Sequence, residues 1–140
     1  MDYGQILSIS AAGMSVERLR LETAALNLAN ANLRSGSPTT AFKPKKVVAF
    51  AQGLYATDFA GRESVSPQAI LEESTLEPKP IHDPGDPLAD AGGFVYAPAV
   101  NPVEEMLTVM TAVRAYEANV RTLEASRGML LRALEIGSGT

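Results

Sequence analysis

The stretch that decides the fold is NPVEEMLTVMTAVRAYEANVRTLEASRGMLLRALEIG, residues 101–137. It opens with helix-start signals: Asn101 is a good N-cap, Pro102 suits the first helical position, and Glu104 can close a capping box. Its apolar residues recur mostly every three or four positions, the pattern of a coiled-coil seam: Val103, Met106, Met110, Val113, Tyr116, Val120, Leu123, Leu130 and Leu134. We therefore expect one helix over residues 102–136, with Gly137 as its natural stop.

The N-terminal stretch predicts a second helix. All nine prolines lie from Pro38 to Pro102, which leaves both ends free of these helix breakers. Residues 2–33 carry one helical stripe, Ile6, Ile9, Ala12, Val16, Leu19, Thr23, Leu26 and Asn30. The helix should stop near residues 30–35, because the following Ser-Gly-Ser-Pro cannot continue it. A helix as long as the C-terminal one cannot bury itself in a 140-residue monomer, so we expect other molecules to complete the core.

The middle of the chain reads as short strands and turns. Residues 45–50, 69–71 and 94–96 are plausible strands, and residues 78–87 form a loop dense with turn residues. Four rings, Phe42, Phe50, Phe94 and Tyr96, are candidates for a small local core. The expected organisation is an N-terminal helix over 1–37, an extended strand-and-turn arm over 38–101 and a C-terminal helix over 102–140. The two helical segments would form one core domain.

Composition excludes several functions. The net charge of −4 argues against nucleic acid as a partner, because phosphate binding needs a basic excess. The absence of cysteine excludes thiol chemistry and Cys-based zinc sites. No apolar run approaches the ~20 residues needed to span a bilayer. The N-terminus lacks the basic and apolar regions of a cleaved signal peptide, so we expect any export to use another route.

Candidate chemical sites are few. His82, Asp83, Asp86 and Asp90 suggest a metal site, but their spacing does not fit a calcium loop, and Asp-Pro and Pro-Gly steps favour turns. A single histidine and the lack of a catalytic triad or phosphate loop argue against an enzyme. Lys43, Lys45 and Lys46 are better read as a solvated strand edge than as a nucleic-acid patch. We predict no cofactor, no metal and no small-molecule substrate.

Three strings carry a specific resemblance. They are residues 27–32 (NLANAN), 101–106 (NPVEEM) and 114–120 (RAYEANV), and the chain closes with Leu134-Glu135-Ile136-Gly137. On spacing alone the first string is typical of a helix C-terminus, and the second of a helix N-terminus. Taken together, they resemble the FlgC family of rod proteins in the bacterial flagellar basal body. The family motif falls on Asn27, Asn30, Asn32, Asn101, Pro102, Glu104, Glu105, Tyr116 and Asn119.

The resemblance implies a mainly α fold, in which the terminal helices pair as an antiparallel coiled coil and the middle forms a small β- and turn-rich arm. It implies a non-enzymatic subunit of the proximal rod, which crosses the periplasm and transmits torque. The implied partners are copies of the same chain, rod proteins of the FlgB, FlgF, FlgG and FliE types, and the flagellar type III export apparatus. The packing surface would be the two stripes: Ile6, Ile9, Val16, Leu19 and Leu26 with Met106, Met110, Val113, Tyr116, Val120, Leu123, Leu130 and Leu134.

The resemblance also implies export without cleavage, and Tyr3 and Leu7 loosely match the aromatic and aliphatic pair of early export substrates. An alternative is a secreted helical protein of a type III secretion system, such as a needle or tip component. A needle subunit is typically a bare helical hairpin, so the insert between Ser37 and Asn101 favours the rod protein.

Overall fold

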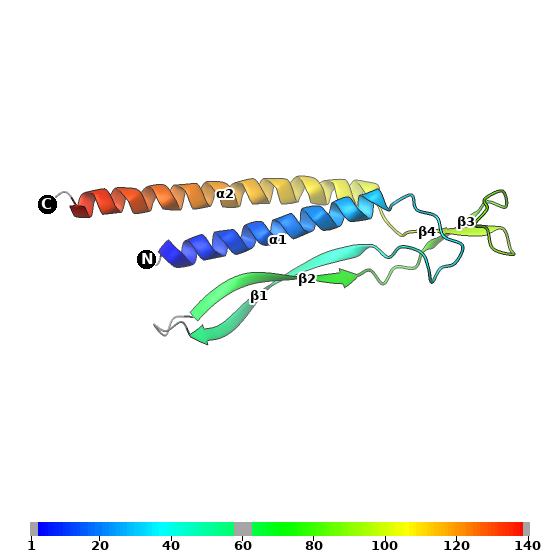
Figure 1. Ribbon diagram of the computed structural model, residues 1–140, viewed down its shortest axis with the longest axis horizontal. Helices are drawn as coiled ribbons and strands as arrows, with labels where there is room; N and C mark the ends of the chain where they lie inside the picture. The colour runs from blue at the N-terminus through cyan, green and yellow to red at the C-terminus, as the bar shows by residue number, and fades with distance from the viewer. Residues whose placement is uncertain (1–2, 58–62, 139–140) are drawn as a thin grey trace. The chain divides into compact units, whose positions relative to one another are not determined.

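The computed structural model describes residues 3–57 and 63–138, in which two helices flank four strands (Figure 1). In chain order the elements are α1 (Tyr3–Ala29), β1 (Lys45–Thr57), β2 (Glu63–Glu73), β3 (Lys79–His82), β4 (Phe94–Ala97) and α2 (Pro102–Ser138). The predicted mainly α class with a small strand region is confirmed. Neither described helix is long and apolar enough to cross a membrane.

Helix α2 begins where the sequence predicts. The Asn101 Oδ1 atom accepts a hydrogen bond from the Val103 backbone N–H at 3.2 Å, which confirms the N-cap. The helix has 37 residues, about 55 Å at 1.5 Å per residue. The expected stop at Gly137 is wrong, because α2 continues to Ser138. A glycine in a last turn costs at most about 1 kcal/mol, which is too little to end a helix by itself.

Helix α1 ends at Ala29, inside the asparagine-rich string. The Asn30 Nδ2 atom donates to the Leu26 carbonyl at 2.8 Å, and the Asn30 backbone N–H donates to the same carbonyl at 3.2 Å. No described residue other than glycine has a positive φ, so these asparagines do not use the left-handed conformation that a helix C-terminus often adopts. The helix end is instead closed by a side chain.

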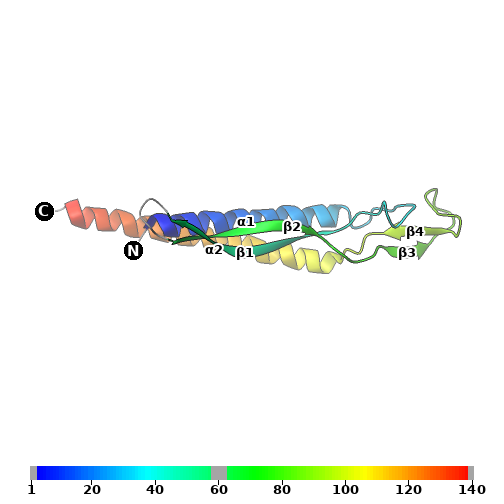
Figure 2. The same cartoon turned by 90° about the horizontal axis from the view of Figure 1, so that it is seen from below.

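The strand β3 corrects the prediction of a loop over residues 78–87. β3 pairs antiparallel with β4, and the two lie side by side in both views (Figures 1 and 2). Pro80, opposite Tyr96, suggested a loop because proline lacks the N–H of a ladder bond. The Tyr96 N–H and C=O both bond to Ser35 on the other side of β4, so no hydrogen bond from residue 80 is needed. Strands β1 and β2 form a separate two-stranded sheet.

Contacts divide the chain into two compact units, which we describe separately. Unit 1 contains residues 1–19, 49–70 and 111–140, and unit 2 contains residues 20–48 and 71–110. In unit 1 the buried residues of the helices are small: Ser10, Val16, Ala112 and Ser126. In unit 2 the core comprises Ala24, Ala41, Val95 and Val100, together with the buried Thr23 and Asn27.

The predicted aromatic core is wrong for two of its four rings. Phe50 and Phe94 are 37% and 39% exposed, and Phe42 and Tyr96 are half-buried. Side chains alternate along a strand, so Phe94 lies outside when its neighbour Val95 is fully buried. The Phe94 ring instead makes an edge contact with the His82 imidazole, with ring centroids 5.0 Å apart.

Candidate assembly surfaces

Asn27 of α1 is the most highly connected residue of the family motif. Its Nδ2 atom donates to the Lys45 carbonyl at 2.7 Å and to Glu105 Oε1 at 2.9 Å. Its Oδ1 atom accepts from the Lys45 backbone N–H at 2.9 Å. The residue is 1% exposed, and the three bonds join α1, the first residue of β1 and the first turn of α2 within unit 2.

The remaining motif residues lie at the ends of the helices or on α2. Asn32 follows α1 and is exposed, and Glu104 is exposed on the first turn of α2. Asn119 lies in unit 1 beside Gly13 of α1, where an added Cβ would come within 3.0 Å of the Asn119 Nδ2 atom. The glycine therefore permits a close approach of the two helices at this point.

The predicted packing stripes divide by exposure. Val16 is buried, and the half-buried members are Ile6, Leu19, Val120, Leu123 and Leu130. The exposed members are Ile9, Leu26, Met106, Met110, Val113, Tyr116 and Leu134. Of the proposed export pair, Leu7 is half-buried in α1, and the side chain of Tyr3 lies outside the described side chains.

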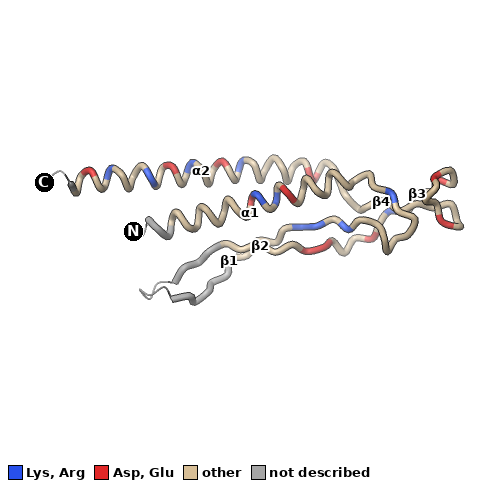
Figure 3. The backbone as a smooth tube through the Cα atoms, in the orientation of Figure 1, with Lys and Arg blue, Asp and Glu red and all other residues tan. Residues whose placement is uncertain are grey.

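Among the described side chains, helix α2 carries the largest set of exposed apolar ones. We call them the exposed apolar residues of α2: Val103, Met106, Leu107 and Met110 in unit 2, and Val113, Tyr116, Met129, Leu131, Leu134 and Ile136 in unit 1. Their exposed fractions run from 38% for Tyr116 to 81% for Ile136. Exposed charges of alternating sign lie along the same helix, at Arg114, Glu117, Arg121 and Glu124, and basic and acidic positions are interspersed along α2 in Figure 3. This helix therefore offers neighbours both apolar and charged surface.

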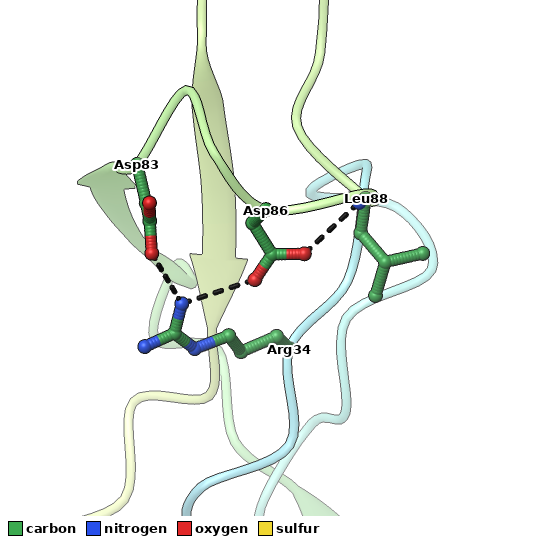
Figure 4. Close-up of polar contacts among 4 residues, drawn as sticks. All are labelled: Arg34, Asp83, Asp86 and Leu88. Carbon is green, nitrogen blue, oxygen red and sulfur yellow. Dashed lines mark hydrogen bonds and ion pairs between the residues drawn. The ribbon is translucent and has the colours of Figure 1, made fainter.

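An ion-pair cluster in unit 2 was not predicted from the sequence. The Arg34 Nη1 atom lies 2.8 Å from Asp83 Oδ2 and 3.0 Å from Asp86 Oδ2 (Figure 4). The Leu88 backbone N–H, the largest cause, and Arg34 together lower the pKa of Asp86 below its ordinary value. Hydrogen bonds to the two aspartates raise the pKa of Arg34. The sequence pointed only to a turn at the two aspartates, because Arg34 is distant from them along the chain.

The aspartates considered for a metal thus act as turn residues. Asp90 Oδ1 accepts from the backbone N–H groups of Gly92 and Phe94, both at 2.9 Å, and Asp90 Oδ2 accepts from the Tyr96 hydroxyl at 3.2 Å. The Phe94 bond is the main cause of the lowered pKa of Asp90, and burial is the main cause of the raised pKa of Tyr96. In the described part of the chain, no group of three or more His, Asp or Glu side chains is arranged to hold a metal ion.

Comparison with known proteins shows which family this sequence matches. Residues 91–136, which cover β4 and most of α2, match the family described as the flagellar basal body rod FlgEFG protein C-terminal. The flagellar basal-body rod protein FlgC of Salmonella typhimurium is 34% identical over 135 residues, covering 94% of this chain and 96% of that protein.

Two further relatives of the same name come from other bacteria. The Aquifex aeolicus protein is 35% identical over 135 residues, covering 96% of this chain and 97% of its own length. The Bacillus subtilis protein is 29% identical over 143 residues, covering 94% and 95%. These matches do not favour a secretion needle or tip component. The chain belongs to the FlgC family of flagellar basal-body rod proteins and is a structural subunit of the bacterial flagellar basal-body rod.

Proposed function

We propose that the chain forms part of the proximal rod, where it packs against copies of itself and against rod proteins of the FlgB, FlgF, FlgG and FliE types. In this proposal α1 and α2 pair as an antiparallel coiled coil. Two local contacts support the pairing: Asn27 bonds to Glu105, and Gly13 lies beside Asn119. Gly13 and Asn27 are two heptads apart on α1, and their partners Asn119 and Glu105 are two heptads apart on α2 in the reverse order. This spacing suits an antiparallel pair with one register.

The observation that carries the proposal is the set of exposed apolar residues of α2. Full burial of a Leu or Met side chain contributes about 1.5–3 kcal/mol, so a half-exposed one still has roughly 1 kcal/mol to gain. Ten such residues supply about 10 kcal/mol before the entropic cost of association, which is of similar size. Several neighbours contacting one helix would therefore be needed for a stiff assembly, as a shaft that transmits torque requires.

Delivery to the rod is part of the same proposal. We infer that the chain reaches the rod through the flagellar type III export apparatus and that Tyr3 and Leu7 contribute to its recognition. The motive is the aromatic–aliphatic spacing at the start of α1. Secretion of Tyr3→Ser and Leu7→Ser variants into the periplasm, compared with an Asn32→Ser control, tests this step. Undiminished secretion of both variants would remove these two residues from the signal.

The assembly experiment uses Leu134→Asp. Leu134 is 61% exposed, so a carboxylate there stays solvated in the isolated chain and should not unfold it. In a packed rod the same carboxylate would be buried without a partner, so we expect loss of the protein from purified basal bodies and loss of swimming. The matched control is Ala125→Asp, a neutral residue exposed on the same helix. Normal incorporation of the Leu134 variant would show that this end of α2 does not pack against neighbours.

A further inference from the structure

The amide of Asn27 is buried at a point where three elements meet. Both of its N–H groups donate, one to the Lys45 carbonyl and one to Glu105 Oε1, and its oxygen accepts from the Lys45 N–H. Toward Lys45 the side chain behaves like the backbone of a neighbouring strand, because it satisfies the N–H and the C=O of one residue together. Aspartate lacks the donors, and an apolar residue lacks both kinds of group.

Next to Asn27, the buried surface of α1 is made of small side chains. The buried neighbours of Asn27 on α1 are Thr23 and Ala24, which are too small to act as distinctive knobs in a helix pair. A buried asparagine with a polar partner at only one place is a known way to specify the register of paired helices. If α2 slipped by one heptad, Asn27 would lose Glu105 and would remain buried without its second acceptor.

We propose that Asn27 is a positioning residue that sets the register of α1 against α2 and, through Lys45, the point at which β1 begins. This inference rests on the helix pairing advanced above. Glu105 accepts the hydrogen bond from Asn27 only in this register, and it is half-buried next to the exposed Glu104. The bonds to Lys45 tie the first residue of β1 to the same reference point.

Disulfide trapping in the full chain measures the register, because the natural sequence contains no cysteine. In the proposed register Thr23 lies one turn from Asn27 and opposite Val109, one turn beyond Glu105. The pair Thr23→Cys with Val109→Cys therefore reports the native register. The pair Asn30→Cys with Val109→Cys reports a slip of one heptad, about 10.5 Å along the helix, which no disulfide spans in the native register.

We expect the native pair to cross-link at least ~20 times more than the slipped pair when Asn27 is present, and less than ~3 times more in the Asn27→Leu background. Leucine keeps the site filled and apolar, so a merely structural role for Asn27 would leave the ratio unchanged. Glu105→Gln retains an acceptor oxygen and should preserve the ratio, as should the exposed control Glu104→Gln. If Asn27→Leu prevents folding, Glu105→Leu removes the same bond from the other helix and should lower the ratio.

Two negative results have different meanings. An unchanged ratio in both leucine variants overturns the role of Asn27 while leaving the helix pair in place. A native pair that fails to cross-link even with Asn27 present overturns the antiparallel pairing itself, and the inference with it. Amide exchange adds an independent reading: the Lys45 N–H should exchange at least ~10 times faster in Asn27→Leu and at the wild-type rate in Glu105→Gln, because its acceptor is Asn27 Oδ1.

Discussion

The substitution Asn27→Asp changes one atom and should make the stability of the chain depend on pH. It replaces the Nδ2 donor with an oxygen, 2.7 Å from the Lys45 carbonyl and 2.9 Å from Glu105 Oε1. Two attractive contacts become oxygen–oxygen contacts at a site that is 1% exposed. Burial and the adjacent Glu105 both favour the neutral form, so the pKa of the new carboxyl should lie above its ordinary value.

The direction of the pH dependence of stability follows from the raised pKa of the new carboxyl. A group whose pKa is higher in the folded state contributes stability at low pH, and that contribution is lost as pH rises through the folded-state value. Each unit of increase costs about 1.4 kcal/mol at neutral pH. With the lost hydrogen bonds, at about 1–3 kcal/mol, we expect the variant to be less stable than the wild type by about 3–5 kcal/mol at pH 7.5. At pH 4.5 the deficit should be less than half of that, because the protonated carboxyl regains one donor.

Urea unfolding followed by far-ultraviolet circular dichroism at the two pH values measures the difference for the full chain. Asn27→Ala should show a deficit that is nearly the same at both pH values, since alanine does not titrate. Asn32→Asp, on an exposed residue, should change stability by less than about 0.5 kcal/mol. Equal deficits for Asn27→Asp at both pH values, or a larger one at pH 4.5, would refute the hydrogen-bond geometry at this site.

Three further predictions address other contacts. Gly128→Ala should stabilise the chain by about 0.5–1 kcal/mol, because nothing lies within 4 Å of its added Cβ. Gly13→Ala should stabilise it less, because its added Cβ meets Asn119. Equal gains in stability in urea unfolding would contradict the close approach of Gly13 to Asn119. Leu123→Asp places a carboxylate at a half-buried position and should lower both folding stability and rod incorporation, whereas the exposed Glu124→Gln should do neither; basal-body content decides between them. Because Arg34 helps to lower the pKa of Asp86, the Asp86 carboxylate stabilises the fold at neutral pH, and this contribution is lost as pH falls through the lowered pKa. In Arg34→Gln the loss should begin at a higher pH. Identical carbonyl NMR titrations of Asp86 in the wild type and the variant would exclude the ion pair in solution.

Both helices, and the start of α2, could be predicted from the sequence because their signals are local. The N-cap at Asn101 and the absence of proline from both ends need no information from distant residues. β3 escaped prediction because the tolerance for Pro80 depends on Ser35, which occupies the hydrogen-bonding groups of Tyr96 from the other side. The residues around Pro80 in the sequence do not reveal that partner.

The asparagine string shows the same limit at the candidate site. Its spacing correctly indicated a helix end, and α1 does end at Ala29. The role of Asn27 depends on Lys45 and Glu105, which are 18 and 78 residues away along the chain, so no window of sequence contains the three together. The Arg34 cluster is hidden for the same reason, with separations of 49 and 52 residues from its aspartates.

The distribution of large and small side chains ties the fold to its use in the rod. Among the described residues, the largest fully buried side chains are Val95 and Asn27, whereas Leu107, Leu134 and Ile136 are more than half exposed. An isolated soluble domain usually has the opposite arrangement, with its large aliphatic side chains inside. Small and polar buried residues let helices approach closely but contribute little transfer free energy, so the apolar surface of α2 has most to gain from neighbouring subunits. A variant that enlarges the interior should therefore stabilise the free chain without strengthening the rod, whereas a charge on the exposed apolar residues of α2 should weaken the rod without unfolding the chain.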